Sequence, residues 1–245
     1  MPTDRKPGSA KQAAARRRIQ EKRAAEAAAR ARAERRRRTL IGGVVGGVLL
    51  VVAVVALIVV QSGRTATSVN AAVPAHTVDH GTTIVVGSST APVTVDLYED
   101  FQCPNCKAFE DQSGQTLTQL VTDGTVQAHY HGMAFLDTSA NGKYSTRALN
   151  AAAAVTDAAG TDAFKKFHDL LYANQPPEGG KGLSDDQLVQ YATQAGASSD
   201  KVAQEIRGLT YGDWVKNVTD QASKDGVTGT PTVLVDGKTL SDLSP

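Results

Sequence analysis

Hydrophobic and polar positions follow a β-type pattern in five short segments in the last two thirds of the chain. Residues 82–86 form a β-branched run, residues 91–98 alternate over positions 93–98, a Gly-Ser-Ser turn separates the two, and residues 126–131 follow an Asp-Gly turn. Residues 232–235 and 238–240 are joined by a second Asp-Gly turn, which is typical of a β-hairpin. The pattern therefore predicts three separate strands followed by a hairpin.

Helical spacing of hydrophobic positions fills the segments between these strands. One helix is predicted at about residues 104–120, directly after the second strand. Glycine breaks and capping serines separate five more predicted helices after the third strand, at residues 144–159, 163–173, 185–195, 199–207 and 211–224. The element order is β, β, α, β, then a helical insertion at about residues 140–225, then a β-hairpin.

The longest apolar run lies near the start of the chain. Residues 40–60 carry no charged or strongly polar side chain, and at about 1.5 Å per residue a helix of this length covers a hydrocarbon core of about 30 Å. We therefore predict a transmembrane signal anchor at residues 39–61. A cleaved secretory signal is the alternative, because residues 69–71 offer small side chains, but the apolar core of such signals is shorter.

The formal net charge of +1 averages two oppositely charged parts. Residues 1–38 contain fourteen basic and four acidic residues, a net of +10, so the rest of the chain carries −9. Four arginines, residues 35–38, abut one end of the apolar run, whereas only Arg64 lies close to the other. The positive-inside rule then predicts a cytoplasmic amino terminus and an extracytoplasmic location for everything after about residue 61.

These features predict four parts along the chain. A basic tail at residues 1–38 lacks aromatic and base-reading residues, so we expect contact with the lipid bilayer and no nucleic-acid partner. The anchor at residues 39–61 is followed by a linker at residues 62–80, which shows no periodicity. Residues 81–245 then form one folded domain of ordinary size.

The two cysteines of the chain stand where the second strand gives way to the first helix, as Cys103-Pro104-Asn105-Cys106. This arrangement suits reversible dithiol–disulfide chemistry, because helix amides and the helix dipole stabilise a thiolate on the first cysteine. Cys103 is predicted to be the exposed, reacting thiol and Cys106, one turn into the helix, the more buried one. An extracytoplasmic location would let their disulfide persist.

A zinc site that joins the cysteines to His129 and His131 is the alternative reading of this motif. One Cys-x-x-Cys with a distant His-x-His is poor zinc spacing. Solvated histidines are therefore favoured, and we expect neither a metal ion nor a cofactor.

Two segments resemble the DsbA-like thiol–disulfide oxidoreductases, and more closely their membrane-tethered bacterial members with an Asp-Phe-x-Cys-Pro-x-Cys motif. The segments are Tyr98-Glu99-Asp100-Phe101-Gln102-Cys103-Pro104-Asn105-Cys106-Lys107 and Val227-Thr228-Gly229-Thr230-Pro231-Thr232-Val233. The resemblance covers about residues 80–245 and implies a thioredoxin-like α/β fold with an inserted helical domain. It also implies exported cysteine-containing proteins as substrates and a membrane partner, a quinone-linked oxidase, that reoxidises the cysteine pair.

The resemblance extends to residues around the cysteines. Pro231 resembles the family's cis-proline, which would hold the Thr230 backbone beside the cysteines for an extended substrate peptide; a trans bond at a strand entry is the alternative. Pro104 suits the first turn of a helix. Asn105 lacks the charge of a histidine at that position, so strong oxidising power is not implied.

The acids before the motif have two readings. Glu99 and Asp100 either relay protons for Cys106 or cap and solvate the loop before the helix. Some family members carry an acid on the preceding strand at the place of Leu97, which puts the relay in question.

We therefore predict a membrane-anchored, extracytoplasmic enzyme that introduces disulfides into exported proteins. A reductase or isomerase is an alternative, and so is a non-catalytic chaperone or partner module of the same fold. Family members close with a helix, and Ser244-Pro245 would begin one where the sequence stops. Either the protein does without this helix or the sequence is truncated.

Overall fold

The computed structural model describes residues 68–240. The predicted tail at residues 1–38, the predicted anchor at residues 39–61 and the predicted cap at Ser244-Pro245 lie outside these described residues. Among the residues that the structure does describe, no helix combines the length and the apolar character needed to cross a membrane.

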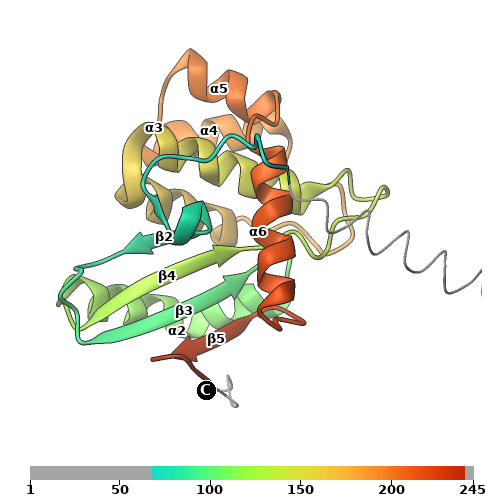
Figure 1. Cartoon of the computed structure of the whole chain (residues 1–245). Helices are drawn as coiled ribbons and strands as arrows, with labels where there is room; N and C mark the ends of the chain where they lie inside the picture. Colours follow the sequence, from blue (N-terminus) through green and yellow to red (C-terminus); the bar gives the residue numbers. More distant parts are fainter. Residues whose placement is uncertain (1–67, 241–245) are drawn as a thin grey trace, which may run out of the picture. The chain divides into compact units, whose positions relative to one another are not determined.

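Six strands form one sheet with the order β1-β2-β4-β3-β5-β6 (Figure 1). Strands β3 and β4 run parallel, whereas the other neighbouring pairs are antiparallel. The bounds of the strands are Thr77–Val78 for β1, Thr83–Val86 for β2, Val93–Glu99 for β3, Val126–Gly132 for β4, Thr232–Val235 for β5 and Lys238–Thr239 for β6. The five strands expected from alternation are confirmed, with ends that differ by up to two residues.

The helices also follow the predicted pattern. Their bounds are Pro104–Thr122 for α2, Tyr144–Ala173 for α3, Asp185–Ala195 for α4, Asp200–Arg207 for α5 and Gly212–Lys224 for α6. The break expected at Gly160 is a kink inside α3, where glycine adopts φ 79° and ψ −174°. A capping box of Ser184 and Gln187 begins α4, as its sequence predicts.

The prediction that residues 62–80 form a tether is wrong for their described part. Residues 77–78 add β1 to the sheet, and a 3-10 turn, η1 (Asp79–Gly81), follows. The Ala75 amide donates to Asp157 over 2.9 Å, and the Trp214 indole donates to the Gly81 carbonyl. A two-residue strand is too short for a periodic signal, so only these long-range contacts reveal that the folded part begins before residue 81.

The two faces of the sheet are covered by different helices. Helix α2 and the second half of α3 pack on one face, and α6 crosses the other (Figure 1). Successive side chains of β3 therefore face different layers, because strand residues alternate between the two faces. Leu97 and Glu99 are buried beneath α2 and α3, whereas Asp96 and Tyr98 are half-buried on the α6 side.

Candidate active site

The cysteine pair sits at the junction of β3 and α2. Cys103 is the residue that caps α2, with extended backbone angles, and Pro104 occupies the first helical position. The Cys103 amide donates to the Asp100 carbonyl over 2.9 Å, which turns the chain from strand into helix. Both thiols are free. Cys106 is fully buried, and Cys103 is 5% exposed, so the first cysteine is more covered than the sequence predicted.

The loop before β5 accounts for this cover. The Thr230–Pro231 peptide bond is cis, the conformation that the resemblance implies, so the trans alternative is wrong. The Cys103 thiol donates to the Thr230 carbonyl oxygen, with 3.2 Å between sulfur and oxygen. These residues are far apart in sequence, but β5 pairs with β3 and Thr232 lies opposite Tyr98. The pairing carries the loop to the end of β3 where α2 begins.

The two thiols differ strongly in their acidity. A hydrogen bond from the Cys106 thiol, together with Thr230 and the amides of Cys106 and Asn105, outweighs burial and lowers the pKa of Cys103 to about 6. Burial, the hydrogen bond to Cys103 and the charge of Glu99 raise the pKa of Cys106 far above its ordinary value. The thiol form of Cys103 thus donates to the Thr230 carbonyl, whereas the thiolate form, which a pKa of about 6 favours at neutral pH, accepts a hydrogen bond from the Cys106 thiol.

Glu99 belongs to a buried cluster behind the cysteines. Its Oε2 lies 2.9 Å from His168 Nε2, and the ligand atoms of Glu99, Glu110 and His168 all lie within 4.8 Å of one another. Within residues 68–240, the Oε1 atoms of Glu99 and Glu110 are buried without a hydrogen-bond partner. Burial opposes a charge on His168, but Glu110 and Glu99 raise its pKa above the ordinary value. Burial and the charge of Glu99 likewise raise the pKa of Glu110.

His168 and Glu110 were not predicted from the sequence. Glu110 follows Cys106 by four residues, so the two share one face of α2, and this spacing was the available signal. His168 interrupts an otherwise apolar helical face, yet a lone histidine in a helix says nothing about its partner. Only the packing of α3 on the sheet brings it to Glu99.

Asp100 holds the loop together. It is fully buried, and its carboxylate accepts hydrogen bonds from the Gln102 amide at 2.9 Å, the Leu136 amide at 3.0 Å and the Ser145 hydroxyl at 2.6 Å. Burial raises the pKa of Asp100 to about 6. These bonds match the capping role predicted for this acid, although the carboxylate is sealed from solvent.

Further polar side chains fix the same loop from the helical insertion. The Gln175 amide donates to the Cys103 carbonyl over 2.8 Å, and buried Gln102 donates to the Gly180 carbonyl over 2.9 Å. Asn141 donates to the Gln102 side chain over 2.7 Å. The sequence analysis did not single out these residues, because nothing local signals that a glutamine or asparagine meets a backbone carbonyl across the fold.

His129 and His131 do not join the cysteines. They lie on β4 beside Asp96, on the face of the sheet that α6 crosses. Among the described residues, no group of potential metal ligands includes Cys103 or Cys106. The zinc alternative that linked the histidines to the cysteines is therefore wrong.

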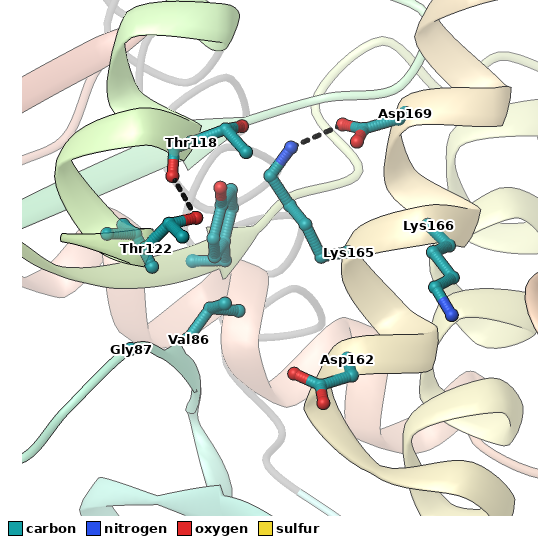
Figure 2. Close-up of a pocket in the computed structure, with 10 residues that line it drawn as sticks. Val86, Gly87, Thr118, Thr122, Asp162, Lys165, Lys166 and Asp169 are labelled. Carbon is teal, nitrogen blue, oxygen red and sulfur yellow. Dashed lines mark hydrogen bonds and ion pairs between the residues drawn. The ribbon is translucent and has the colours of Figure 1, made fainter. Parts of the chain in front are cut away.

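A cavity of about 530 Å³ lies between β2, α2 and α3, away from the cysteines. Figure 2 shows Lys165 paired with Asp169 one turn further along α3, Asp162 one turn before Lys165, and Thr122 donating to the Thr118 carbonyl on α2. A neighbouring cavity of about 330 Å³ is lined by Glu110 together with Lys165 and Asp169. This second cavity brings solvent to one member of the buried cluster.

Residues 79–245 match the thioredoxin family. Reduced DsbG from Mycobacterium tuberculosis is 36% identical with a TM-score of 0.59, over 66% of this chain and 81% of that one. Reduced DsbA from the same organism is 35% identical with a TM-score of 0.58, over 66% and 85%. This chain belongs to the DsbA-like thiol–disulfide oxidoreductases of the thioredoxin family. The predicted thioredoxin-like fold with a helical insertion is thus confirmed.

Curated relatives include proteins of different length. Disulfide bond formation protein D of Bacillus subtilis is 26% identical over 162 residues, which are 65% of this DsbA-like chain and 70% of that protein. The serine/threonine-protein kinase PknE of Mycobacterium tuberculosis is 28% identical over 157 residues, or 61% of this chain. The DsbA-like chain spans only 28% of the length of PknE.

Proposed function

We propose that this protein introduces disulfide bonds into exported proteins through a Cys103–Cys106 redox pair. The observation that carries the proposal is the Cys103 sulfur, which lies 3.2 Å from the carbonyl of Thr230 beside a cis-proline, at the amino terminus of α2. The names of related proteins, DsbA and disulfide bond formation protein D, support the same direction of chemistry.

The oxidised pair would act in two exchange steps. A substrate thiolate attacks the Cys103 sulfur, so that a substrate–Cys103 disulfide forms, the Cys103–Cys106 bond breaks and Cys106 leaves as a thiolate. A second substrate thiolate then attacks the substrate sulfur of this mixed disulfide, and Cys103 leaves as a thiolate. The substrate gains one disulfide, and its two electrons stay on the reduced cysteine pair. The low pKa of Cys103 makes it a good leaving group.

Cys106 needs a proton when it leaves and must lose that proton when the pair is reoxidised. We assign this exchange to Glu99, whose Oε1 is buried without a hydrogen-bond partner and whose charge acts on Cys106. Glu110, four residues along α2 from Cys106, lines the 330 Å³ cavity and would pass the proton to solvent, while His168 holds Glu99 in place. Asp100 is a poorer relay, because three donors already occupy its oxygens.

The substrate would lie along the loop before β5. Gly229 and Thr228 are exposed next to Thr230, whose carbonyl lies beside the Cys103 sulfur. An extended peptide that pairs with the Thr230 backbone gains main-chain hydrogen bonds without a sequence requirement. Such binding suits an enzyme that accepts many different exported proteins.

We also propose that residues 39–61 anchor the protein in the membrane, with the catalytic domain on the extracytoplasmic side. The support is the uncharged run at residues 40–60 and the arginines before it. A membrane oxidase would then accept the two electrons of the reduced pair. Protease added to intact spheroplasts should digest the domain and spare a fragment of the tail and anchor; protection of the whole chain would contradict this topology.

Two measurements test the redox function. The oxidised protein should form disulfides in a reduced, unfolded two-cysteine substrate, and Cys103→Ala should abolish this activity. Reduced Cys106→Ala, mixed with a substrate that already carries a disulfide, should trap a Cys103–substrate mixed disulfide, because Cys103 attacks the substrate disulfide, one substrate thiolate leaves and no Cys106 is present to release the substrate. Peptide binding and a cellular phenotype that both survive in Cys103→Ala would favour the non-catalytic chaperone. Equilibration with glutathione gives the direction, because a potential near about −120 mV indicates an oxidant and one near about −270 mV a reductase.

A further inference from the structure

A second histidine–carboxylate cluster occupies the face of the sheet that α6 crosses. Asp96 on β3 lies opposite His129 on β4, and His131 follows two residues later on the same face. Asp96 Oδ1 is 3.0 Å from His131 Nε2 and 3.5 Å from His129 Nδ1. The three side chains are between 16% and 22% exposed, so solvent ions can reach them.

The spacing of these atoms matches that of ligands around one metal ion. Zinc binds imidazole nitrogen and carboxylate oxygen at about 2.0–2.2 Å, and a tetrahedral arrangement of such bonds separates neighbouring ligand atoms by about 3.3–3.6 Å. The 3.5 Å between Asp96 Oδ1 and His129 Nδ1 lies within this range, and the 3.0 Å between Asp96 Oδ1 and His131 Nε2 is about 0.3 Å shorter than its lower end. All three ligand atoms lie within 4.8 Å of one another, so small side-chain rotations suffice to surround an ion.

The outer atoms of both imidazole rings already have partners. His129 Nε2 lies 3.0 Å from Gln127 Oε1, and the amide oxygen can only accept, so His129 donates from Nε2. Nδ1 is therefore the His129 nitrogen that faces Asp96 and is left to bind a cation. The Thr83 hydroxyl lies 3.4 Å from His131 Nδ1, and Tyr98 stacks on the His131 ring with 4.3 Å between ring centroids. Such support is usual for metal-binding histidines.

Space for a further ligand adjoins the cluster. A cavity of about 170 Å³ adjoins His131 and is also lined by Tyr98 from the sheet, by Gln221 from α6 and by Asp225, the residue that follows α6. A cavity of this size has room for water beside His131. Three protein ligands with one open position are the arrangement of many zinc sites that exchange a ligand.

We propose that Asp96, His129 and His131 bind one divalent transition-metal ion, with zinc as the ion that fits two imidazoles and a carboxylate. The site is separate from the cysteine pair and does not depend on the proposed redox function. It joins neighbouring strands β3 and β4, so a bound ion links the two strands that form the centre of the sheet.

The test uses the full-length protein with Cys103→Ser and Cys106→Ser, since free thiols also bind zinc. Calorimetric titration with Zn²⁺ should give one site per chain, and Co²⁺ should show the visible absorption of a four-coordinate ion. Asp96→Asn and His131→Gln should each weaken Zn²⁺ binding at least about 10-fold. His80→Ala is the matched control, because His80 is an exposed histidine outside the cluster, and its affinity should stay within two-fold.

Two results would overturn the proposal. One is the absence of Zn²⁺ binding to the cysteine-free protein, which would leave the cluster as hydrogen-bonded side chains only. The other is binding that Asp96→Asn and His131→Gln do not weaken. Asp96→Asn keeps the size of the side chain, so it decides the question even if His131→Gln fails to fold.

Discussion

The two faces of β3 carry two clusters of similar chemistry in different surroundings. Glu99 meets Glu110 and His168 beneath α2 and α3, where the histidine is buried and two carboxylate oxygens lack partners among the described residues. Asp96 meets His129 and His131 on the α6 side, where every member is partly exposed. In the first cluster, burial makes the pKa of each group depend strongly on the charges of the other two groups. The groups of the second cluster are open to ions from solvent.

The largest difference is expected in stability. His168→Leu would remove the buried positive partner of Glu99, and loss of one member of a buried charge cluster costs about 3–5 kcal/mol. His131→Leu removes a partly exposed partner of Asp96 and should cost less than about 1 kcal/mol. Urea unfolding of the full-length protein without added metal measures both. Equal losses would contradict the contrast between the faces.

A smaller difference is expected in the rate of disulfide exchange. Glu99→Gln keeps an acceptor for His168 but removes the group proposed to exchange a proton with Cys106, so turnover should fall about 100-fold. Asp96→Asn should stay within two-fold of the natural protein, because Asp96 faces away from the cysteines. The rate of substrate oxidation as a function of pH measures both variants. A loss that is the same at every pH would indicate a structural role for Glu99.

The buried carboxylate of Asp100 belongs to neither cluster, and its hydrogen-bond partners are two backbone amides and a hydroxyl group and not a histidine. Asp100→Asn turns an amide nitrogen toward one of three donors and should cost about 2 kcal/mol of unfolding free energy near pH 8. The pKa of Asp100 is raised to about 6 in the folded protein, so this acid reduces stability as pH rises from about 4 through 6. Unfolding experiments across this pH range should show the unfolding free energy of the natural protein falling as pH rises. The fall should be smaller in Asp100→Asn.

The smallest effect concerns the thiolate itself. The pKa of Cys103 is lowered to about 6, so its contribution to the stability of the reduced protein is present above the unfolded pKa and is lost as pH falls through about 6. Stability of the reduced protein should therefore rise relative to the oxidised protein from about pH 6 to 9. Ultraviolet absorbance of the thiolate should give a midpoint near 6 in the natural protein and in Asp96→Asn. A midpoint above 8 would contradict this hydrogen-bonded arrangement.

Several features of the site were predictable because their signals are local. Strand alternation and the Cys-x-x-Cys motif located the junction of β3 and α2, and the cis conformation before Pro231 followed from the resemblance. The tether at residues 62–80 was predicted wrongly in its described part, because β1 depends on pairing with β2 and has no periodic pattern of its own.

The sequence by itself determined which residues share a side of each element. Asp96 and Glu99 are three apart on one strand, so they must face opposite layers, and Cys106 and Glu110 are four apart on one helix, so they must share a face. Only the tertiary structure decided what each side meets. The partners Thr230, His168 and His131 arrive through strand pairing and helix packing between distant segments. The periodicity of a strand or helix sets the direction in which each side chain points, whereas packing between distant segments decides which residue that side chain contacts.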